Sequence, residues 1–451
     1  MSDRKPSHPA DGGAARSRTG YALMAGLLSA MPLGGTIPIP LYVLYQARMG
    51  FGHLTITVVF AVYVIGTLLA LLFFGGLSDH IGRKRVLVGA IALAAASTGV
   101  FLVATDVPTL VVARVLSGFA AGLATGTATA AIAELHPRGD HRAAAVVASG
   151  VNMIGLGLGP LLAGVLAQYA PAPLHTVFWV YLGVTAAALV GLSLIPETAA
   201  QRDGVVSLRP NVSVPASVRR VLAGAALAIF AAFSLLGLFS SLVPSFLRGT
   251  LGIHNLAVIG AVSFLIFATG ATSQAAFSRL AGRVSVGSGL VLLLVGLAGL
   301  ELALFTEVLW LFLVGTVLSG AAVGLVFRGG LGEINRVVAP ARRASVISMF
   351  FVAAYLGMAA PVVLIGLLSQ TMELVVASAF IAGVVALIGL AALAVVLRTF
   401  GASATPGPTA PALAAVRPAP VGGAVHADAR RDPRVPAGVR PDRNQKANDA
   451  R

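Results

Sequence analysis

The chain contains no cysteine and few charged residues, and each shortage excludes a class of protein. Without cysteine it can form neither a disulfide framework nor a thiolate metal site. Charged residues make up 10% of the chain, well below the roughly 25% of a soluble domain, whereas hydrophobic residues make up 57%. A soluble fold could not bury so much apolar surface. The composition therefore indicates a membrane protein built from helices, which satisfy their own backbone hydrogen bonds in lipid.

Apolar runs follow one another from Tyr21 to Arg398, and many reach the roughly 20 residues that a helix needs to cross a bilayer. The first run is too long for a cleaved signal peptide, so we expect an uncleaved span that Pro38 and Pro40 bend near its outer end. The predicted spans are 21–47, 54–76, 84–103, 108–134, 143–169, 175–195, 219–246, 255–277, 286–304, 308–333, 344–369 and 372–397. The sequence thus predicts an all-α membrane protein with twelve transmembrane helices.

Acidic residues are scarce as well, with 16 Asp and Glu against 31 Lys and Arg, and the net charge is +15. The basic residues form short clusters between apolar runs or lie in the C-terminal tail, which is the pattern of the positive-inside rule rather than of a nucleic-acid-binding surface. The clusters at 83–85, 138–142 and 336–343 fall on one side if the spans alternate. We therefore expect a multi-pass inner-membrane protein with both termini cytoplasmic, whose partners are the lipid bilayer and a small-molecule substrate, and no nucleic acid.

Polar connections divide the chain into five parts. We expect a cytoplasmic N-terminal segment over 1–20, a six-helix bundle over 21–195, a central cytoplasmic loop over 196–218, a second six-helix bundle over 219–398, and a disordered basic cytoplasmic tail over 399–451.

The two predicted bundles contain an internal repeat. Residues 115–118 read Val-Leu-Ser-Gly and recur at 317–320, and Gly122 and Gly324 follow in the same register. The matched spans cross in the same direction, so the repeat is parallel and the bundles are pseudo-symmetric. Such symmetry predicts a cavity between the bundles that opens to each side of the membrane in turn.

The loop between the second and third spans carries a recognisable motif. Residues 75–84 read Gly-Gly-Leu-Ser-Asp-His-Ile-Gly-Arg-Lys, which resembles the major facilitator superfamily signature G-x-L-x-D-x-x-G-R-K. The matching residues are Gly75, Leu77, Asp79, Gly82, Arg83 and Lys84. The resemblance covers about residues 21–398 and implies a transporter of the twelve-span drug or metabolite exporter branch. The alternative is an ordinary tight basic loop.

The resemblance also implies roles for the motif's charged residues. Arg83 is expected to bridge Asp79 and an acid at the cytoplasmic end of span four, where Glu134 lies, and Asp79 is expected to meet the start of span eleven. Together these contacts would latch the cytoplasmic gate. The second copy of the loop has Arg279 in place of the acid, so we expect the latch only in the first half.

Two further elements resemble motifs of exporters in this family. Arg114 and Gly118 match the span-four element R-x-x-x-G, which is implicated in proton coupling; the alternative is an arginine that snorkels to the outer interface. Gly155, Gly159, Pro160 and Gly164 match the span-five element G-x-x-x-G-P-x-x-G-G in all but one glycine. The alternative is helix packing through small residues.

Five polar or amphipathic residues inside spans are candidates for lining a substrate cavity: Arg328, Asn152, Gln274, Tyr63 and Tyr355. Arg328 either binds an anionic substrate or pairs with Glu333; the others either face the cavity or make interhelical contacts. We find no carboxylate near the midplane, which disfavours a polycationic drug and leaves neutral, amphipathic and anionic substrates open.

The sequence shows no phosphate loop, no nucleophile arrangement and no metal-ligand cluster, so we expect neither an enzyme nor a bound metal or cofactor. The energy would come from an ion gradient, with protons favoured, or from the substrate's own gradient. Our hypothesis is proton-coupled efflux of a small hydrophobic molecule or metabolite by alternating access, with the monomer as the functional unit. The alternatives are an uptake permease, either a proton symporter or a facilitator, for a sugar, organic anion or nucleoside, and a membrane sensor that does not transport.

Overall fold

The computed structural model describes residues 10–198 and 218–400, and within these ranges the chain is helical with short connections and no strand. The described residues contain 12 helices long and apolar enough to cross a membrane, as the sequence predicted. The other residues, including most of the predicted central loop and nearly all of the predicted tail, lie outside the described ranges.

The first half contains eight helical segments for six spans. They are α1 (Ala10–Thr36), α2 (Pro38–Met49), α3 (His53–Phe74), α4 (Leu77–Ile81), α5 (Arg83–Leu102), α6 (Val107–Leu135), α7 (His141–Tyr169) and α8 (Pro173–Ser193). α1 and α2 form one span, Arg18–Met49, which is interrupted at Ile37 because Pro38 has no N–H to continue the helix. Helix α1 already begins at Ala10, within the segment that was expected to precede the first span.

The second half supplies the other six spans. Its elements are α9 (Arg219–Ser245), the π-helical turn η2 (Phe246–Thr250), α10 (Leu256–Ala276), α11 (Gly282–Thr306), α12 (Leu309–Val337), α13 (Pro340–Leu368) and α14 (Leu374–Thr399). η2 continues α9, so this span reaches Thr250, four residues beyond the predicted end.

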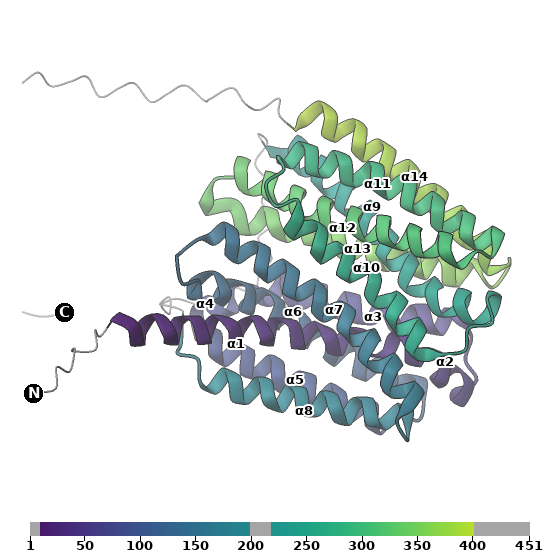
Figure 1. Ribbon diagram of the computed structural model, residues 1–451, viewed down its shortest axis with the longest axis horizontal. Helices are drawn as coiled ribbons and strands as arrows, with labels where there is room; N and C mark the ends of the chain where they lie inside the picture. The colour runs from purple at the N-terminus through teal and green to yellow at the C-terminus, as the bar shows by residue number, and fades with distance from the viewer. Residues whose placement is uncertain (1–9, 199–217, 401–451) are drawn as a thin grey trace, which may run out of the picture. The chain divides into compact units, whose positions relative to one another are not determined.

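The helices form two bundles, α1–α8 in purple to teal and α9–α14 in teal to yellow in Figure 1. Two hydrophobic clusters lie within the first bundle, and a large one lies almost wholly within the second. The bundles meet chiefly where α3 packs on α13 and where α7 packs on α10. All the described residues fall within one compact unit, so the two bundles belong to one folded body.

The internal repeat recurs in the way glycines pack the helices. The missing Cβ of Gly118 lets α6 approach the Tyr63 carbonyl of α3, and Gly320 does the same for α12 at the Ile266 carbonyl of α10. A side chain at either glycine would overlap with that backbone. Small residues therefore set the close helix packing in both halves.

Candidate functional site

The charged loop motif lies at one end of the bundles, where α3, α6 and α12 end and α5, α7 and α11 begin. We call this the basic end, and the end where α3 and α10 begin the opposite end. At the basic end, Gly82 separates α4 from α5 with a φ of 100°, a left-handed conformation that favours glycine. The motif glycine thus allows the turn that starts α5 at Arg83.

Arg83, at the start of α5, joins α4 and α6. Its guanidinium lies 2.6 Å from Asp79 and 2.9 Å from Glu134, and it also donates to the hydroxyl of Ser78. The side chain is only 13% exposed, so these acids replace much of its hydration. The structure thus brings together the three charges that the sequence reasoning linked. The predicted contact of Asp79 with the start of span eleven stays a prediction, because most side chains in the first turn of α13 lie outside the described set.

The sequence reasoning missed Glu197, which it placed in the central loop. Its carboxylate accepts hydrogen bonds from the backbone N–H groups of Arg83 (2.8 Å) and Lys84 (3.1 Å). These are amides of the first turn of α5, where a negative charge is favourable. In return, the Lys84 ammonium donates to the carbonyls of Ser193, the last residue of α8, and of Ile195 just beyond it. The only sequence signal was an acid just beyond span six, on the side of the basic loop.

Arg114 of α6 is fully buried, so the interpretation of a snorkelling arginine is wrong. Its guanidinium donates to the carbonyls of Gly35 and Val59, and its carbon lies 4.6 Å from the centroid of the Tyr63 ring. Within the described chain, its Nη2 has no hydrogen-bond partner. A membrane-buried cation is therefore balanced by carbonyl dipoles and an aromatic face, with no carboxylate paired to it among the described residues.

The span-five motif packs α7 between two helices. A side chain at Gly155 would overlap with the Ser29 carbonyl of α1, and one at Gly164 would overlap with the Leu256 carbonyl of α10. Gly159 likewise faces α1, and the Pro160 carbonyl abuts Gly260 of α10. The motif thus brings α7 close to α10 near the opposite end, which joins the two bundles there.

A cavity of about 320 Å³ lies between the bundles. The second bundle lines it with an aromatic wall, and the first lines it with hydroxyl and amide groups. The aromatic wall consists of Phe233, Phe327, Phe351 and Tyr355, and the polar side includes Tyr63, Thr67, Thr125 and Asn152. Among the described residues, no Asp, Glu, Lys or Arg lines this cavity.

Three of the five predicted cavity residues, Asn152, Tyr63 and Tyr355, line this space. Gln274 does not: it is buried and donates to the sulfur of Met153 at 2.9 Å, so the methionine covers it. Of its two alternatives, Gln274 makes the interhelical contact and does not face the cavity, because α10 packs along α7.

Arg328 lies outside the cavity, in a wider hollow of about 740 Å³ at the basic end. It donates to the carbonyls of Ser278 and Leu280, in the turn between α10 and α11. Glu333, its proposed partner, forms an ion pair with Arg336 at 2.6 Å. The hollow and the cavity share Ala145, Ser149, Leu331 and Asn335 in their walls. The cavity therefore adjoins the hollow at the basic end.

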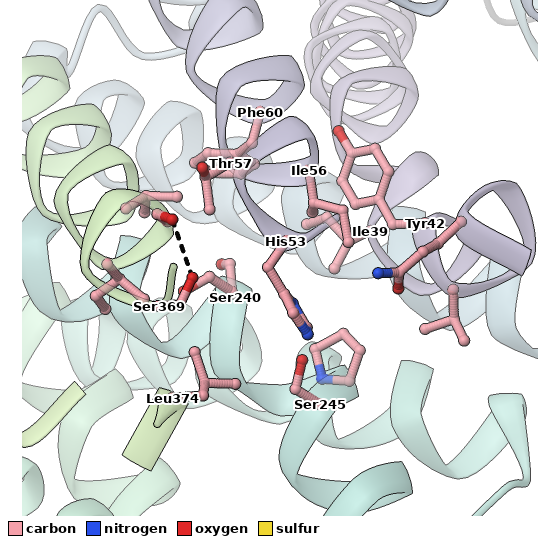
Figure 2. Close-up of a pocket in the computed structure, with 17 residues that line it drawn as sticks. Ile39, Tyr42, His53, Ile56, Thr57, Phe60, Ser240, Ser245, Ser369 and Leu374 are labelled. Carbon is pink, nitrogen blue, oxygen red and sulfur yellow. Dashed lines mark hydrogen bonds between the residues drawn. The ribbon is translucent and has the colours of Figure 1, made fainter. Parts of the chain in front are cut away.

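A small pocket of about 50 Å³ lies at the opposite end. Figure 2 shows its labelled side chains, which include Tyr42, His53 and Thr57 from the first bundle and Ser240, Ser245 and Ser369 from the second.

A hydrophobic cluster separates this pocket from the cavity. Phe60 and Val362 face the pocket, and Tyr63 and Met358 face the cavity. A side chain at Gly366 of α13 would overlap with Thr57 of α3. Close packing therefore closes the opposite end.

Comparison with known proteins identifies relatives of this chain. A family model described as Major Facilitator Superfamily matches residues 22–300. The MFS-type transporter pydD of Acremonium sp is 31% identical over 38% of this chain and 29% of its own length. The 3-(3-hydroxy-phenyl)propionate transporter of Escherichia coli (strain K12) is 34% identical over 40% of this chain and 42% of its own length. The matched part of the chain thus spans less than half of these relatives.

A solved structure, that of the human organic anion transporter MFSD10 (TETRAN), has the same fold. It superposes with a TM-score of 0.62 at 18% sequence identity, covering 84% of this chain and 99% of the human chain.

Proposed function

Because the chain belongs to the Major Facilitator Superfamily, we propose that this membrane transporter exports a small hydrophobic molecule or metabolite in exchange for protons. The observation that carries the proposal is the cavity between the bundles, which adjoins the hollow at the basic end and is closed by close packing at the opposite end. Such a cavity is suited to alternating access, in which the bundles rock about a central site.

The charge distribution supports loading from the cytoplasm. Basic residues gather at the end where the cavity opens, and the positive-inside rule assigns that end to the cytoplasm. Both described ends of the helical chain, in α1 and α14, lie on the same side as the motif loop if the spans alternate. The protein would then sit in the inner membrane with both termini cytoplasmic and take its substrate from inside the cell.

Arg114 supports the coupling to protons. Its charge is buried in the membrane without an acidic partner among the described residues, and Tyr63, whose ring it faces, lines the cavity. A fixed positive charge beside the cavity makes the free energy of a charged occupant depend on whether the cavity is open to water. We propose that Arg114 tunes coupling in this way, whereas Asp79, Arg83 and Glu134 latch the basic end.

One relative supports an aromatic small molecule as the cargo. The Escherichia coli protein is named for 3-(3-hydroxy-phenyl)propionate, and the cavity here has an aromatic wall that would bind a ring. The monomer would suffice for transport, since one chain encloses the cavity.

The proposal is tested by loading cells that express the protein with a fluorescent hydrophobic dye and following its release. Release that is faster than in cells without the protein, and that stops when a protonophore collapses the gradient, supports proton-coupled export. Accumulation of the dye would favour the uptake permease. If neither release nor accumulation changes for any compound in a broad panel, a non-transporting sensor becomes the better interpretation.

A further inference from the structure

The space between the bundles has two chemically different regions that meet along α12. Phe327, Leu331 and Asn335 recur every four residues on one face of this helix, and all three line the cavity. Arg328 and Arg336 lie on the adjacent stripe and line the hollow at the basic end. The helix rises about 1.5 Å per residue, so both arginines lie within about 14 Å of Phe327 along the axis. One small molecule can therefore reach both regions.

The aromatic wall offers a surface for a flat ring. The ring centroids of Phe233 and Phe327 are 6.2 Å apart, those of Phe327 and Phe351 are 6.0 Å apart, and those of Phe351 and Tyr355 are 6.3 Å apart. These separations are typical of aromatic rings that pack on one another, and a further ring can add to such a cluster at its exposed face.

The hollow carries an excess of positive charge. Arg279, Arg328 and Arg336 line it, and the one acid among the described residues of its wall is Glu333, which is buried in its ion pair with Arg336. Arg279 is exposed. Because no acid among the described residues lines the cavity, a cationic ligand would lose its hydration there without gaining a counter-charge, whereas an anionic one would approach arginines.

We infer that the cargo is an amphipathic aromatic anion, bound with its ring against Phe327 and Phe351 and its acid group toward Arg328 and Arg279. The inference rests on the proposed function, and it names the substrate class that the proposed function leaves open. Arg328 directly follows Phe327 in the chain, and the carbonyls of Ser278 and Leu280 fix its guanidinium near the junction of the two regions.

The charge preference is tested by measuring the binding of three probes to the purified full chain by titration calorimetry. The probes are 1-naphthoate, the neutral 1-naphthamide and the cationic 1-naphthylmethylammonium, which share one ring system. We expect 1-naphthoate to bind at least about tenfold more tightly than the amide, and the ammonium to bind most weakly. Equal affinity for the acid and the amide, or tightest binding of the ammonium, would overturn the inference.

Single substitutions test the contributions of the aromatic wall and of the hollow to binding separately. Phe327→Ala should weaken 1-naphthoate and 1-naphthamide by the same factor, whereas Arg279→Gln should weaken 1-naphthoate several-fold and leave the amide unchanged. Arg283→Gln is the matched control, because Arg283 is exposed at the same end, donates to the Leu397 carbonyl and does not line the hollow. If Arg283→Gln lowers the affinity for 1-naphthoate as much as Arg279→Gln does, the surface charge acts nonspecifically and the hollow does not recognise the acid.

Measurements of binding and of transport test this inference and the proposed function separately. Binding of 1-naphthoate needs no gradient, so tight binding without proton-driven movement in proteoliposomes would contradict coupled export and uphold the cargo class. Proton-driven movement of the amide or the ammonium, without movement of 1-naphthoate, would uphold the exporter and overturn the cargo class.

Discussion

The two halves of the chain share their helix packing but differ in their charges. Gly118 and Gly320 let corresponding helices approach, and so do Gly164 and Gly366, which each join one bundle to the other. At the basic end, Lys84 and Arg283 each donate to carbonyls near the end of the last span of their own half. The packing thus follows the repeat, and departures from the repeat mark where the halves have different tasks.

Two departures concern the first half. In the first loop, Arg83 binds two acids, Asp79 and Glu134. In the second loop, Arg279 stands at the position that corresponds to Asp79. Arg114 directly precedes the repeated Val-Leu-Ser-Gly segment of span four, whereas Thr316 directly precedes the copy in span ten and donates to the Phe312 carbonyl. The first half therefore carries the proposed latch and coupling residues, and the second half supplies the aromatic wall.

The largest effect is expected where the halves are alike. Gly164→Leu and Gly366→Leu should each abolish transport, because a large side chain would collide with the facing helix and hold the opposite end apart. Overpacking of this kind costs roughly 1–3 kcal/mol in a packed core. Initial transport rates in proteoliposomes measure the effect. Gly183→Leu is the control, since a side chain at Gly183 meets open space, and loss of transport in this variant too would contradict the explanation.

A smaller effect should separate the two loops. Arg83→Gln leaves Asp79 and Glu134 without their shared partner. The conformation that contains this network should lose about 2 kcal/mol, which lowers its equilibrium population relative to the others by roughly thirtyfold. Arg283→Gln removes a hydrogen bond at an exposed side chain and should cost less than about 1 kcal/mol. The transport rates and melting temperatures of both variants give the comparison. Equal losses would mean that the loop motif does no more in the first half than in the second.

Replacing Arg114 of span four by threonine, the residue at the corresponding position of span ten, should uncouple transport from the proton gradient. Arg114→Thr should reduce the stimulation by a pH gradient by roughly fivefold or more, the size of a typical coupling free energy, while downhill exchange continues. Arg114→Lys keeps the charge and should retain part of the stimulation. Transport of both variants is measured with and without an imposed gradient. Unchanged stimulation in Arg114→Thr would remove this residue from the coupling mechanism.

The smallest effect should come from Glu197→Gln. Loss of the negative charge at the start of α5 should lower the stability by about 0.3–1 kcal/mol, because the amides of Arg83 and Lys84 keep a neutral acceptor. Thermal unfolding in detergent measures this change. Glu307→Gln, at the left-handed residue that directly follows α11, is the control and should leave the melting temperature unchanged. A larger shift for Glu307→Gln than for Glu197→Gln would contradict the capping role.

The sequence allowed prediction of features that depend on composition along one helix. Twelve spans follow from the apolar runs, and the kink before Pro38 follows from a missing N–H. Contacts between helices were harder to predict, because the sequence does not say which face is covered. Gln274 therefore stood as a cavity candidate although Met153 covers it, and Glu333 was offered as a partner for Arg328 although Glu333 pairs with Arg336. Glu197 escaped notice because its contacts are with backbone amides distant in sequence.

The central claim is that the space between the bundles opens at one end while it closes at the other. The chain contains no cysteine, so single cysteines report on each end without interference. Ser149→Cys lies between the cavity and the basic-end hollow, and Ser245→Cys lines the pocket at the opposite end. Their rates of reaction with a water-soluble maleimide should differ, with Ser149→Cys faster at rest. An imposed pH gradient should slow Ser149→Cys and accelerate Ser245→Cys together, whereas rates that change independently, or not at all, would contradict alternating access.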